Sequence, residues 1–255
     1  HIESLIDFDK IKSSHPNIIF DGLYSATIGY FDKLLKNHGI KFKSLHLKHD
    51  PNFGGGMPEP KPQYMQELIA LVKNNVNHIG FANDGDGDRF GVIDEKGNYV
   101  TPNEIIAILL IHLAKNKHLK GSLVKTVGGS TLLDLVAKKL DVELIETAVG
   151  FKHVGEAMRK YNPIIGGEDS GGLSIQGHIP EKDGILANLL ILEAMAYENK
   201  TLVQLQEDLY KLVNSKFYND RIDLKLDNQE LVKKALENAE KLKNLGNANV
   251  IKINK

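Results

Sequence analysis

The sequence predicts an α/β protein made of two similar three-layer α/β/α domains with mixed, mostly parallel sheets, followed by a partial C-terminal α+β segment. In each half of the chain, short apolar runs typical of strands alternate with longer segments of helical periodicity, an order that favours parallel sheets covered by helices. The halves also align without a gap in strand, turn and helix when Ser25 is set against Ser130. We therefore expect domains at residues 1–100 and 101–214, and the beginning of another at 215–255.

The first half begins with a polar, partly helical segment and then alternates strands with helices. Apolar runs typical of buried strands occur at residues 17–20, 40–47, 76–82 and 90–93. Helical spacing of apolar residues occurs at residues 26–37, 63–74 and 105–114. We expect Ser25 to cap the first of these helices, and Thr101 or Asn103 to cap the last. Residues 50–62 contain prolines and glycines too closely spaced for a helix or a central strand, so they predict an irregular loop.

The second half repeats this plan. Strand-like runs occur at residues 122–126, 142–145 and 164–165. Segments of helical spacing occur at residues 131–140, 151–161, 184–197 and 201–212. From Phe217 the composition shifts toward Lys, Asn and Glu, and a strand-like run at 221–226 precedes a charged amphipathic helix at 228–242. This order predicts a third α/β unit of which the chain contains only the beginning.

The composition is that of an ordinary globular protein. Hydrophobic residues make up 42% of the chain and charged residues 25%. A net charge of -1 argues against a broad surface for nucleic acid. The longest apolar runs, at residues 105–111 and 185–191, are too short to cross a bilayer. The sequence has no cysteine and no signal-peptide pattern, so we expect a cytoplasmic protein without disulfides that binds neither nucleic acid nor membranes.

The most informative segment is an acidic loop that follows the predicted strand at 76–82. Asp84, Asp86 and Asp88 alternate with two glycines, and Arg89 follows directly. Carboxylates packed this closely raise one another's pKa by repulsion, which a bound divalent cation removes, and oxygen ligands suit hard ions such as Mg²⁺ or Ca²⁺. The glycines permit the sharp turns that bring the three side chains together. The pattern predicts a metal site.

Three other interpretations of the acidic loop remain. The first is a polar hairpin turn, because Asp-Gly is a common turn signal. The second is an EF-hand that uses Glu95 as its last ligand, although Arg89 stands where that loop needs a glycine and the flanking segments are strand-like. The third is the nucleophile loop of an aspartyl phosphotransferase, which would account for Asp84 and Asp86 but not for Asp88.

A second glycine-rich loop, around Glu168 and Ser170, has the corresponding place in the second half of the chain. Its carboxylate and hydroxyl, with glycines on both sides, suit hydrogen bonds to neighbouring hydroxyls of a sugar. The polar loop that follows carries His178 and Lys182. Each is by itself more typical of a solvated surface, but together they bring cationic groups near the second loop, where one could transfer a proton if its pKa is lowered.

Three motifs in this order resemble the α-D-phosphohexomutase superfamily, which includes phosphoglucomutases, phosphomannomutases and phosphoglucosamine mutases. The motifs are Asp84-Gly85-Asp86-Gly87-Asp88-Arg89, Gly167-Glu168-Asp169-Ser170-Gly171-Gly172 and His178-Ile179-Pro180-Glu181-Lys182-Asp183-Gly184. Further similarity is found at Phe53-Gly54-Gly55, Pro58-Glu59-Pro60 and Gly150-Phe151-Lys152. The resemblance covers nearly the whole chain, and it departs from related sequences at Gly56, where an arginine is common.

The resemblance implies a role for nine residues. It implies that Mg²⁺ is bound by Asp84, Asp86 and Asp88. It implies that the sugar substrate is bound by Glu168, Ser170 and Lys152. It implies that the reaction is assisted by Lys182, His178 and Arg89. In this scheme Lys182 is a general acid or base near the reacting hydroxyl, and Arg89 contacts a phosphoserine.

The resemblance also implies a four-domain enzyme that moves a phosphoryl group between the 1- and 6-positions of a hexose. The transfer uses a phosphoserine and an intermediate of the glucose 1,6-bisphosphate type. This chain resembles the second and third domains and the start of the fourth, and it contains neither the Ser-His-Asn-Pro motif of the phosphoserine nor the family's C-terminal phosphate-binding loop. We expect its partners to be a phosphosugar and the N- and C-terminal domains of the same protein, and we expect no turnover by the chain alone.

The choice of hexose depends on the second loop. Its Gly-Glu-Asp-Ser-Gly-Gly form favours a glucose or mannose phosphate over a glucosamine phosphate. The alternatives are a phosphoglucosamine mutase of the same superfamily and a Ca²⁺-stabilised structural or binding module.

Overall fold

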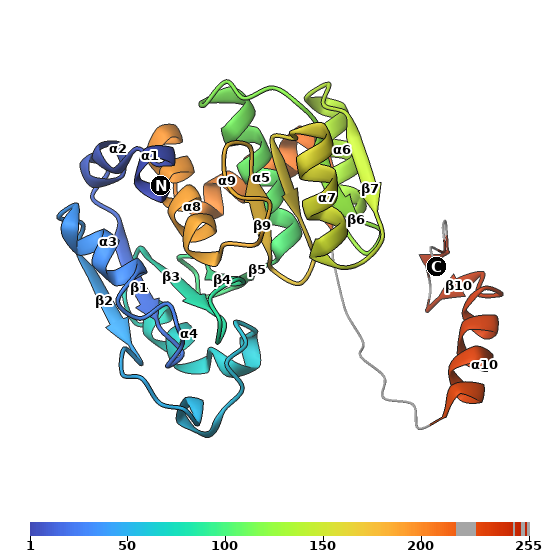
Figure 1. Ribbon diagram of the computed structural model, residues 1–255, viewed down its shortest axis with the longest axis horizontal. Coiled ribbons are helices and arrows are strands. Elements are labelled where there is room, and N and C mark those ends of the chain that lie inside the picture. Colours follow the sequence, from blue (N-terminus) through green and yellow to red (C-terminus); the bar gives the residue numbers. More distant parts are fainter. Residues whose placement is uncertain (218–227, 247, 251–252, 254–255) are drawn as a thin grey trace. The chain divides into compact units, whose positions relative to one another are not determined.

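The computed structural model describes residues 1–217, 228–246, 248–250 and 253 of the chain (Figure 1). The chain divides into two compact units, His1–Phe217 and Tyr218–Lys255. The larger unit contains two mostly parallel sheets with helices, which confirms the predicted α/β class. The strand expected at 221–226 lies outside the described residues.

The first sheet carries the acidic loop. Its strands are β1 (Asn17–Asp21), β2 (Phe42–Leu45), β3 (His78–Asn83), β4 (Phe90–Ile93) and β5 (Tyr99–Val100). They are ordered β2-β1-β3-β4-β5, with β1 parallel to β2 and β3, while β4 runs antiparallel to both of its neighbours. The acidic loop joins β3 to β4, so it lies at the carboxyl end of the parallel strands, where α/β sheets bind ligands.

Short helices accompany this sheet. They are α1 (Ile2–Leu5), α2 (Phe8–Ser13), α3 (Phe31–Asn37) and α4 (Gln66–Lys73), with 3₁₀ turns at Phe53–Gly55 and Pro62–Tyr64. The prediction of a helix from residue 26 was wrong, because α3 starts at Phe31. Gly29 has a left-handed φ of 86°, and its N–H donates to the Asp32 carboxylate. Ser25 hydrogen bonds to Thr27 instead of capping a helix.

The second sheet repeats the strand order of the first. Its strands are β6 (Leu123–Thr126), β7 (Leu144–Thr147), β8 (Ile165–Gly167) and β9 (Leu173–Ile175). The order is β7-β6-β8-β9, with β6 parallel to β7 and β8 and with β9 antiparallel. This matches β2-β1-β3-β4, so the loop containing Glu168 and Ser170 joins the two strands that correspond to β3 and β4. The internal repeat inferred from the sequence is present in the topology.

Longer helices pack with the second sheet. They are α5 (Pro102–Lys115), α6 (Thr131–Lys139), α7 (Phe151–Tyr161), α8 (Gly184–Glu198) and α9 (Leu202–Val213). Of the two caps considered for α5, Thr101 is the one observed: its hydroxyl accepts from the Glu104 N–H, and the Glu104 carboxylate accepts from the Thr101 N–H. Ser130, the counterpart of Ser25 in the alignment of the two halves, caps α6 by accepting the Leu132 N–H.

Helix α8 joins the two halves of the larger unit. It is buried along most of its length, and it contacts α2, β3 and β4 from the first half and α5 and β9 from the second (Figure 1). A single hydrophobic cluster extends from Phe81 through Leu189 to Ile106. A helix that is apolar on every side is stable only when it is surrounded in this way. The domain boundary at residue 100 therefore stays a prediction, because both predicted domains share one core.

Glu193 of α8 is fully buried and ties three segments together. Its carboxylate accepts the Asp7 backbone N–H over 2.8 Å and lies 2.9 Å from Nε2 of His112 and 2.7 Å from Nζ of Lys117. Burial alone would raise the pKa of Glu193, but these hydrogen bonds outweigh burial, and the pKa is lowered from its ordinary value of 4.5. Glu193 is therefore ionised in the folded protein at neutral pH.

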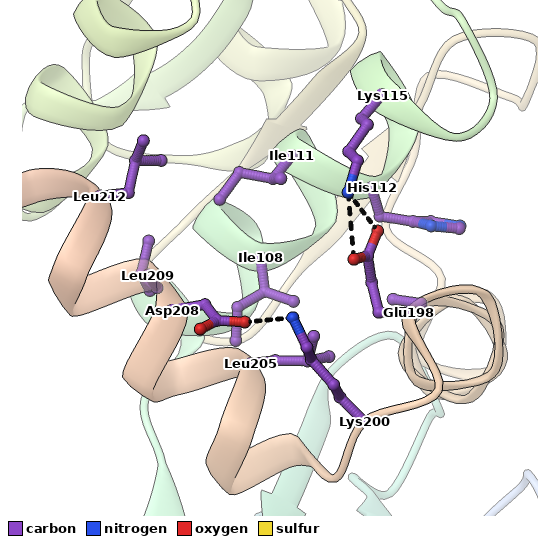
Figure 2. A pocket seen from close by; sticks show the side chains of 11 residues that line it. Ile108, Ile111, His112, Lys115, Glu198, Lys200, Leu205, Asp208, Leu209 and Leu212 are labelled. Atoms are coloured by element: carbon purple, nitrogen blue, oxygen red, sulfur yellow. Dashed lines mark hydrogen bonds and ion pairs between the residues drawn. The ribbon is translucent and has the colours of Figure 1, made fainter.

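A hollow of about 230 Å³ lies between α5, α8 and α9 (Figure 2). Its apolar wall is formed by Ile108, Ile111, Leu205, Leu209 and Leu212. The charged side chains on its rim pair with one another, since Lys115 contacts Glu198 and Lys200 contacts Asp208 (Figure 2). None of the residues that line the hollow belongs to the nine candidate site residues, so the candidate chemistry lies elsewhere.

The smaller unit contains α10 (Gln229–Ala239), which agrees with the amphipathic helix predicted at 228–242, and a short antiparallel pair, β10 (Asn244–Leu245) and β11 (Ala248–Asn249). Leu231, Val232 and Leu236 of α10 are exposed. In the part of the chain that the structure describes, no helix combines the length and the apolar character that crossing a membrane requires.

Replacing Glu193 by Ala should lower the free energy of unfolding by about 3–5 kcal/mol, because Lys117 and the Asp7 N–H would lose their buried partner. Urea denaturation measures this loss. The lowered pKa also fixes the pH dependence: the stability that Glu193 contributes is present above pH 4.5 and is lost as the pH falls below it. Glu193→Gln should lack that part of the acid sensitivity, and an unchanged pH profile in this variant would contradict the assignment.

Candidate functional site

The three aspartates of the acidic loop converge as the sequence predicted. Each of Asp84, Asp86 and Asp88 offers a carboxylate oxygen, and these oxygens lie within 4.8 Å of one another. Asp84 is buried, Asp86 is exposed and Asp88 is intermediate, so the group opens to solvent on one side. Three hard oxygen donors at this spacing fit a divalent cation such as Mg²⁺, whose remaining positions would be filled by water or a phosphate.

The conformation of the acidic loop is fixed by its own backbone and by two neighbouring loops. The Gly87 N–H donates to the Asp84 carbonyl over 3.1 Å. Gly85 donates its N–H to Pro58 and accepts the N–H of Ala26, both over 3.0 Å. Gly87 has a φ of 83°, and a Cβ there would lie 2.6 Å from the Thr27 methyl carbon. Only glycine fits that position.

Arg89 turns back onto the carboxylate that begins the loop. Its Nε donates to Oδ2 of Asp84 over 2.5 Å, and its backbone N–H donates to Oδ1 over 2.9 Å. Burial raises the pKa of Asp84 to about 6, although the hydrogen bonds from Arg89 act against this rise. NH1 of Arg89 also lies 3.8 Å from Glu59. Arg89 therefore balances buried negative charge in this structure.

Lys182 reaches across from the second half of the chain to the acidic loop. Its Nζ lies 2.5 Å from Oδ2 of Asp88. Burial acts to lower the pKa of Lys182, but the hydrogen bond to Asp88 and the negative charges of Asp88, Glu168 and Glu181 outweigh it, so the pKa is raised. The proton is therefore held on Lys182 at neutral pH, and the lowered pKa considered from the sequence does not occur in this state.

The second loop places Glu168 and Ser170 side by side. Ser170 Oγ donates to Oε2 of Glu168 over 3.3 Å, and Oε1 of Glu168 accepts the Gly150 N–H over 3.0 Å. Gly150 precedes α7 directly, so Lys152, which is exposed in the first turn of that helix, lies two residues after the one that holds Glu168. The intervening Asp169 accepts from Asn103 over 2.6 Å. Glu168 and Ser170 thus belong to one hydrogen-bonded region, and exposed Lys152 lies next to it in sequence. The substrate-binding role of all three residues stays a prediction.

The acidic loop and the second loop touch through backbone atoms. The Phe90 N–H donates to the Gly171 carbonyl over 3.0 Å, and the Gly184 N–H donates to the Gly87 carbonyl over 3.1 Å. A Cβ on Gly184 would lie 2.5 Å from the Arg89 carbonyl oxygen. The acidic loop therefore lies against both the second loop and the start of α8.

His178 has a different environment from Lys182. Its Nε2 lies 3.1 Å from Oδ2 of Asp183, and its ring stacks on that of His1 with centroids 5.3 Å apart. Asp183 also caps α8 by accepting the Leu186 N–H. The structure thus connects His178 to the site through Asp183, and a direct role at a reacting hydroxyl stays a prediction.

The EF-hand interpretation was wrong. The segments on either side of the acidic loop are the strands β3 and β4, and the Glu95 carboxylate accepts the N–H groups of Leu202 and Val203 at the start of α9, over 2.8 and 3.2 Å. Glu95 therefore caps a helix, which is the favourable place for a carboxylate near the positive end of a helix dipole.

Some residues of the site were not found from the sequence. Glu59 lies beside Arg89, Asn103 holds Asp169, and Asn83 lies beneath the acidic loop. Glu59 was noticed only as part of a motif, and Asn103 only as a potential helix cap. Asparagines at strand and helix ends are ordinary, so only the tertiary contacts distinguish them.

Comparisons with known proteins decide the family. The model of phosphoglucomutase/phosphomannomutase α/β/α domain II matches residues 1–97, and the model of α/β/α domain III matches residues 101–213. The chain belongs to the phosphoglucomutase/phosphomannomutase family of the α-D-phosphohexomutase superfamily. The resemblance seen in its motifs is thereby confirmed.

Individual relatives of this family cover most of the chain. A phosphoglucomutase/phosphomannomutase of Thermococcus kodakarensis is 30% identical over 243 residues, which is 94% of this chain and 52% of the relative. A phosphoglucosamine mutase of Clostridium botulinum is 35% identical over 82% of this chain and 46% of the relative. The crystal structure of the phosphoglucomutase parafusin from Paramecium aligns with a TM-score of 0.74 at 28% identity, over 82% of this chain and 40% of the other. The chain thus spans about half the length of the curated relatives it matches.

Replacing Gly184 by Ala should disturb the acidic loop, because the new methyl group would collide with the Arg89 carbonyl and the Asn83 amide. We expect a loss of about 1–3 kcal/mol in the free energy of unfolding, measured by denaturant titration. Gly128→Ala is the control, since a Cβ there would meet no atom of the described residues within 4 Å. Equal stability of the two variants would contradict the close contact at Gly184.

Proposed function

We propose that this chain is the metal- and sugar-binding part of a phosphohexomutase that interconverts hexose 1-phosphate and hexose 6-phosphate. The observation that carries the proposal is the direct contact of the acidic loop with the loop of Glu168 and Ser170 and, through the pair of Asp88 and Lys182, with the polar loop that follows it. Family membership supports the same reaction class. The substrate proposed is a phosphosugar, and the proposal includes a cytoplasmic location, as the sequence led us to expect.

Asp84, Asp86 and Asp88 are the proposed ligands of Mg²⁺. When bound there, the cation would offset negative charge on a phosphoryl group during transfer. Arg89 would keep Asp84 oriented in the loop, and its planar group of donors suits a phosphoryl oxygen that approaches the same face. The proposal includes a phosphoserine from the N-terminal domain of the same protein as the source of that phosphoryl group.

Lys182 is proposed as the proton donor. Its ion pair with Asp88 keeps it protonated and places its ammonium beside the acidic loop. A protonated amine there can give its proton to a sugar oxygen as a phosphoryl group leaves it, and can take the proton back in the reverse direction. Glu168 and Ser170 would fix the sugar by its hydroxyls, and exposed Lys152 is the proposed contact to its phosphate or hydroxyls.

The hexose proposed is glucose or mannose. A hexose 1,6-bisphosphate is the proposed intermediate, and it reorients in the site between the two phosphoryl transfers. A glucosamine phosphate is the second candidate, because relatives named phosphoglucosamine mutase match this chain at 30–36% identity. The C-terminal segment is proposed to begin the fourth domain, which would hold the distal phosphate.

A metal titration tests the proposed cation site. Asp86→Asn should weaken Mn²⁺ binding by more than about tenfold, because the site loses a charged ligand. Electron paramagnetic resonance counts the free Mn²⁺. Glu95→Gln is the control and should bind like wild type, since Glu95 caps α9. Ca²⁺-selective binding that depends on Glu95 would instead favour a structural calcium module.

A bisphosphate titration tests the sugar site. Glucose 1,6-bisphosphate should bind the Mn²⁺-loaded chain, and its ³¹P resonances should broaden because one phosphate lies near the paramagnetic ion. Glu168→Gln should weaken this binding by roughly tenfold, the effect of losing a charged hydrogen-bond acceptor. Glu156→Gln, on the exposed face of α7, is the control. Equal binding by both variants would reject Glu168 as a sugar ligand.

An activity assay tests whether catalysis by this chain requires the phosphoserine of the N-terminal domain. The 255-residue chain alone should not convert glucose 1-phosphate to glucose 6-phosphate, because it contains no Ser-His-Asn-Pro motif. Conversion is followed by a coupled glucose 6-phosphate dehydrogenase assay. Robust turnover by this chain would overturn the proposed phosphoserine mechanism.

A further inference from the structure

The base of the acidic loop is tied to α8 by a buried pair of amide side chains. Asn83 is the last residue of β3 and Asn188 lies in the second turn of α8, and both are 0% exposed. Nδ2 of Asn188 donates to Oδ1 of Asn83 over 3.1 Å, and Nδ2 of Asn83 donates to the Arg89 carbonyl over 3.0 Å. A chain of hydrogen bonds therefore runs from α8 through Asn83 to the end of the acidic loop.

Stability alone does not explain this pair. Oδ1 of Asn188 is buried and has no hydrogen-bond partner among the residues that the structure describes, which is unfavourable. Aliphatic side chains at both position 83 and position 188 would leave neither amide unsatisfied. Neighbouring positions of α8 carry such side chains, namely Leu186, Leu189 and Leu192, all fully or almost fully buried. The amide of Asn188 makes a hydrogen bond through its nitrogen but not through its oxygen. Its presence in an apolar helix therefore indicates a role other than packing.

The N-terminal end of α8, one turn before Asn188, also contacts the acidic loop. The Gly184 N–H donates to the Gly87 carbonyl, and Lys182, just ahead of the helix, contacts Asp88. Gly87 and Asp88 lie in the middle of the loop, whereas Asn83 and Arg89 form its two ends. A shift of α8 relative to the loop would therefore change the positions of the aspartates and of Lys182 together.

We propose that Asn188 is a positioning residue that acts through Asn83 to hold Asp84, Asp86 and Asp88 in their cation-binding arrangement, aligned with Lys182. The inference rests on the proposed metal site. Asn188 touches neither cation nor sugar in this scheme, and it has the place of the hydrogen-bonding partners that orient metal ligands from behind.

Mn²⁺ titration of the full 255-residue chain, read by electron paramagnetic resonance, tests the proposal. Asn188→Leu should weaken Mn²⁺ binding by about 10- to 100-fold, the range seen when such outer partners are removed. Its thermal midpoint should also fall, because the buried Oδ1 of Asn83 loses its donor. Asn188→Ala is a second variant that cannot overpack the site. Leu192→Ala, one turn along the same face, is the matched control: it should lower the thermal midpoint and leave the Mn²⁺ affinity unchanged.

A double-mutant cycle tests whether Asn188 acts on the aspartates through Asn83. Asn83→Ala and Asn188→Leu together should weaken binding no more than the stronger single variant, because both remove one link. Additive losses would overturn the inference, as would equal weakening by Leu192→Ala. Wild-type affinity in both Asn188 variants, with Asp86→Asn still defective, would overturn the inference and leave the metal site standing. No Mn²⁺ binding by the wild-type chain would reject the metal site, and the inference with it.

Discussion

The burial of α8 is the constraint on which the larger unit depends. An almost wholly apolar helix of this length has to be enclosed, and the surfaces that enclose it come from both halves of the chain. Its N-terminus is consequently held against the acidic loop, where the Gly184 N–H meets the Gly87 carbonyl. Further along the helix, the buried Glu193 fixes its axial position through Asp7, His112 and Lys117. Hydrophobic burial in one helix thus determines how the polar loops at its end are placed.

Much of this could be predicted from the sequence because it rests on local patterns. The periodicity and the length of the apolar runs predicted the alternation of strands and helices. The alignment of the two halves, with Ser25 set against Ser130, indicated two copies of one topology. The convergence of Asp84, Asp86 and Asp88 followed from short spacing on a glycine-containing turn, where three side chains have few other directions to take.

The rest depends on contacts between distant segments, which spacing does not encode. Nothing near Lys182 shows that its partner is Asp88, and nothing near Glu95 shows that it caps α9. The early start predicted for α3 failed for the same reason. Apolar spacing favoured a helix from residue 26, but Gly29 and the contact of Ala26 with Gly85 hold residues 25–30 in turns behind the acidic loop. Tertiary hydrogen bonding outweighed local periodicity there.

The acidic loop meets the second loop and the start of α8 through glycine backbone, which limits the substitutions that these contacts allow. At Gly171 and Gly184 the contact is made by backbone N–H and C=O groups. A side chain at either position would collide with the backbone of Phe90 or Arg89. A substitution at either glycine would break the backbone contact, and no side chain there could change its geometry gradually. The side chains that would meet a ligand, such as Glu168, Ser170 and Asp86, take no part in this backbone contact. Point mutations at these side chains can therefore change what would meet a ligand without disturbing the backbone contacts at Gly171 and Gly184.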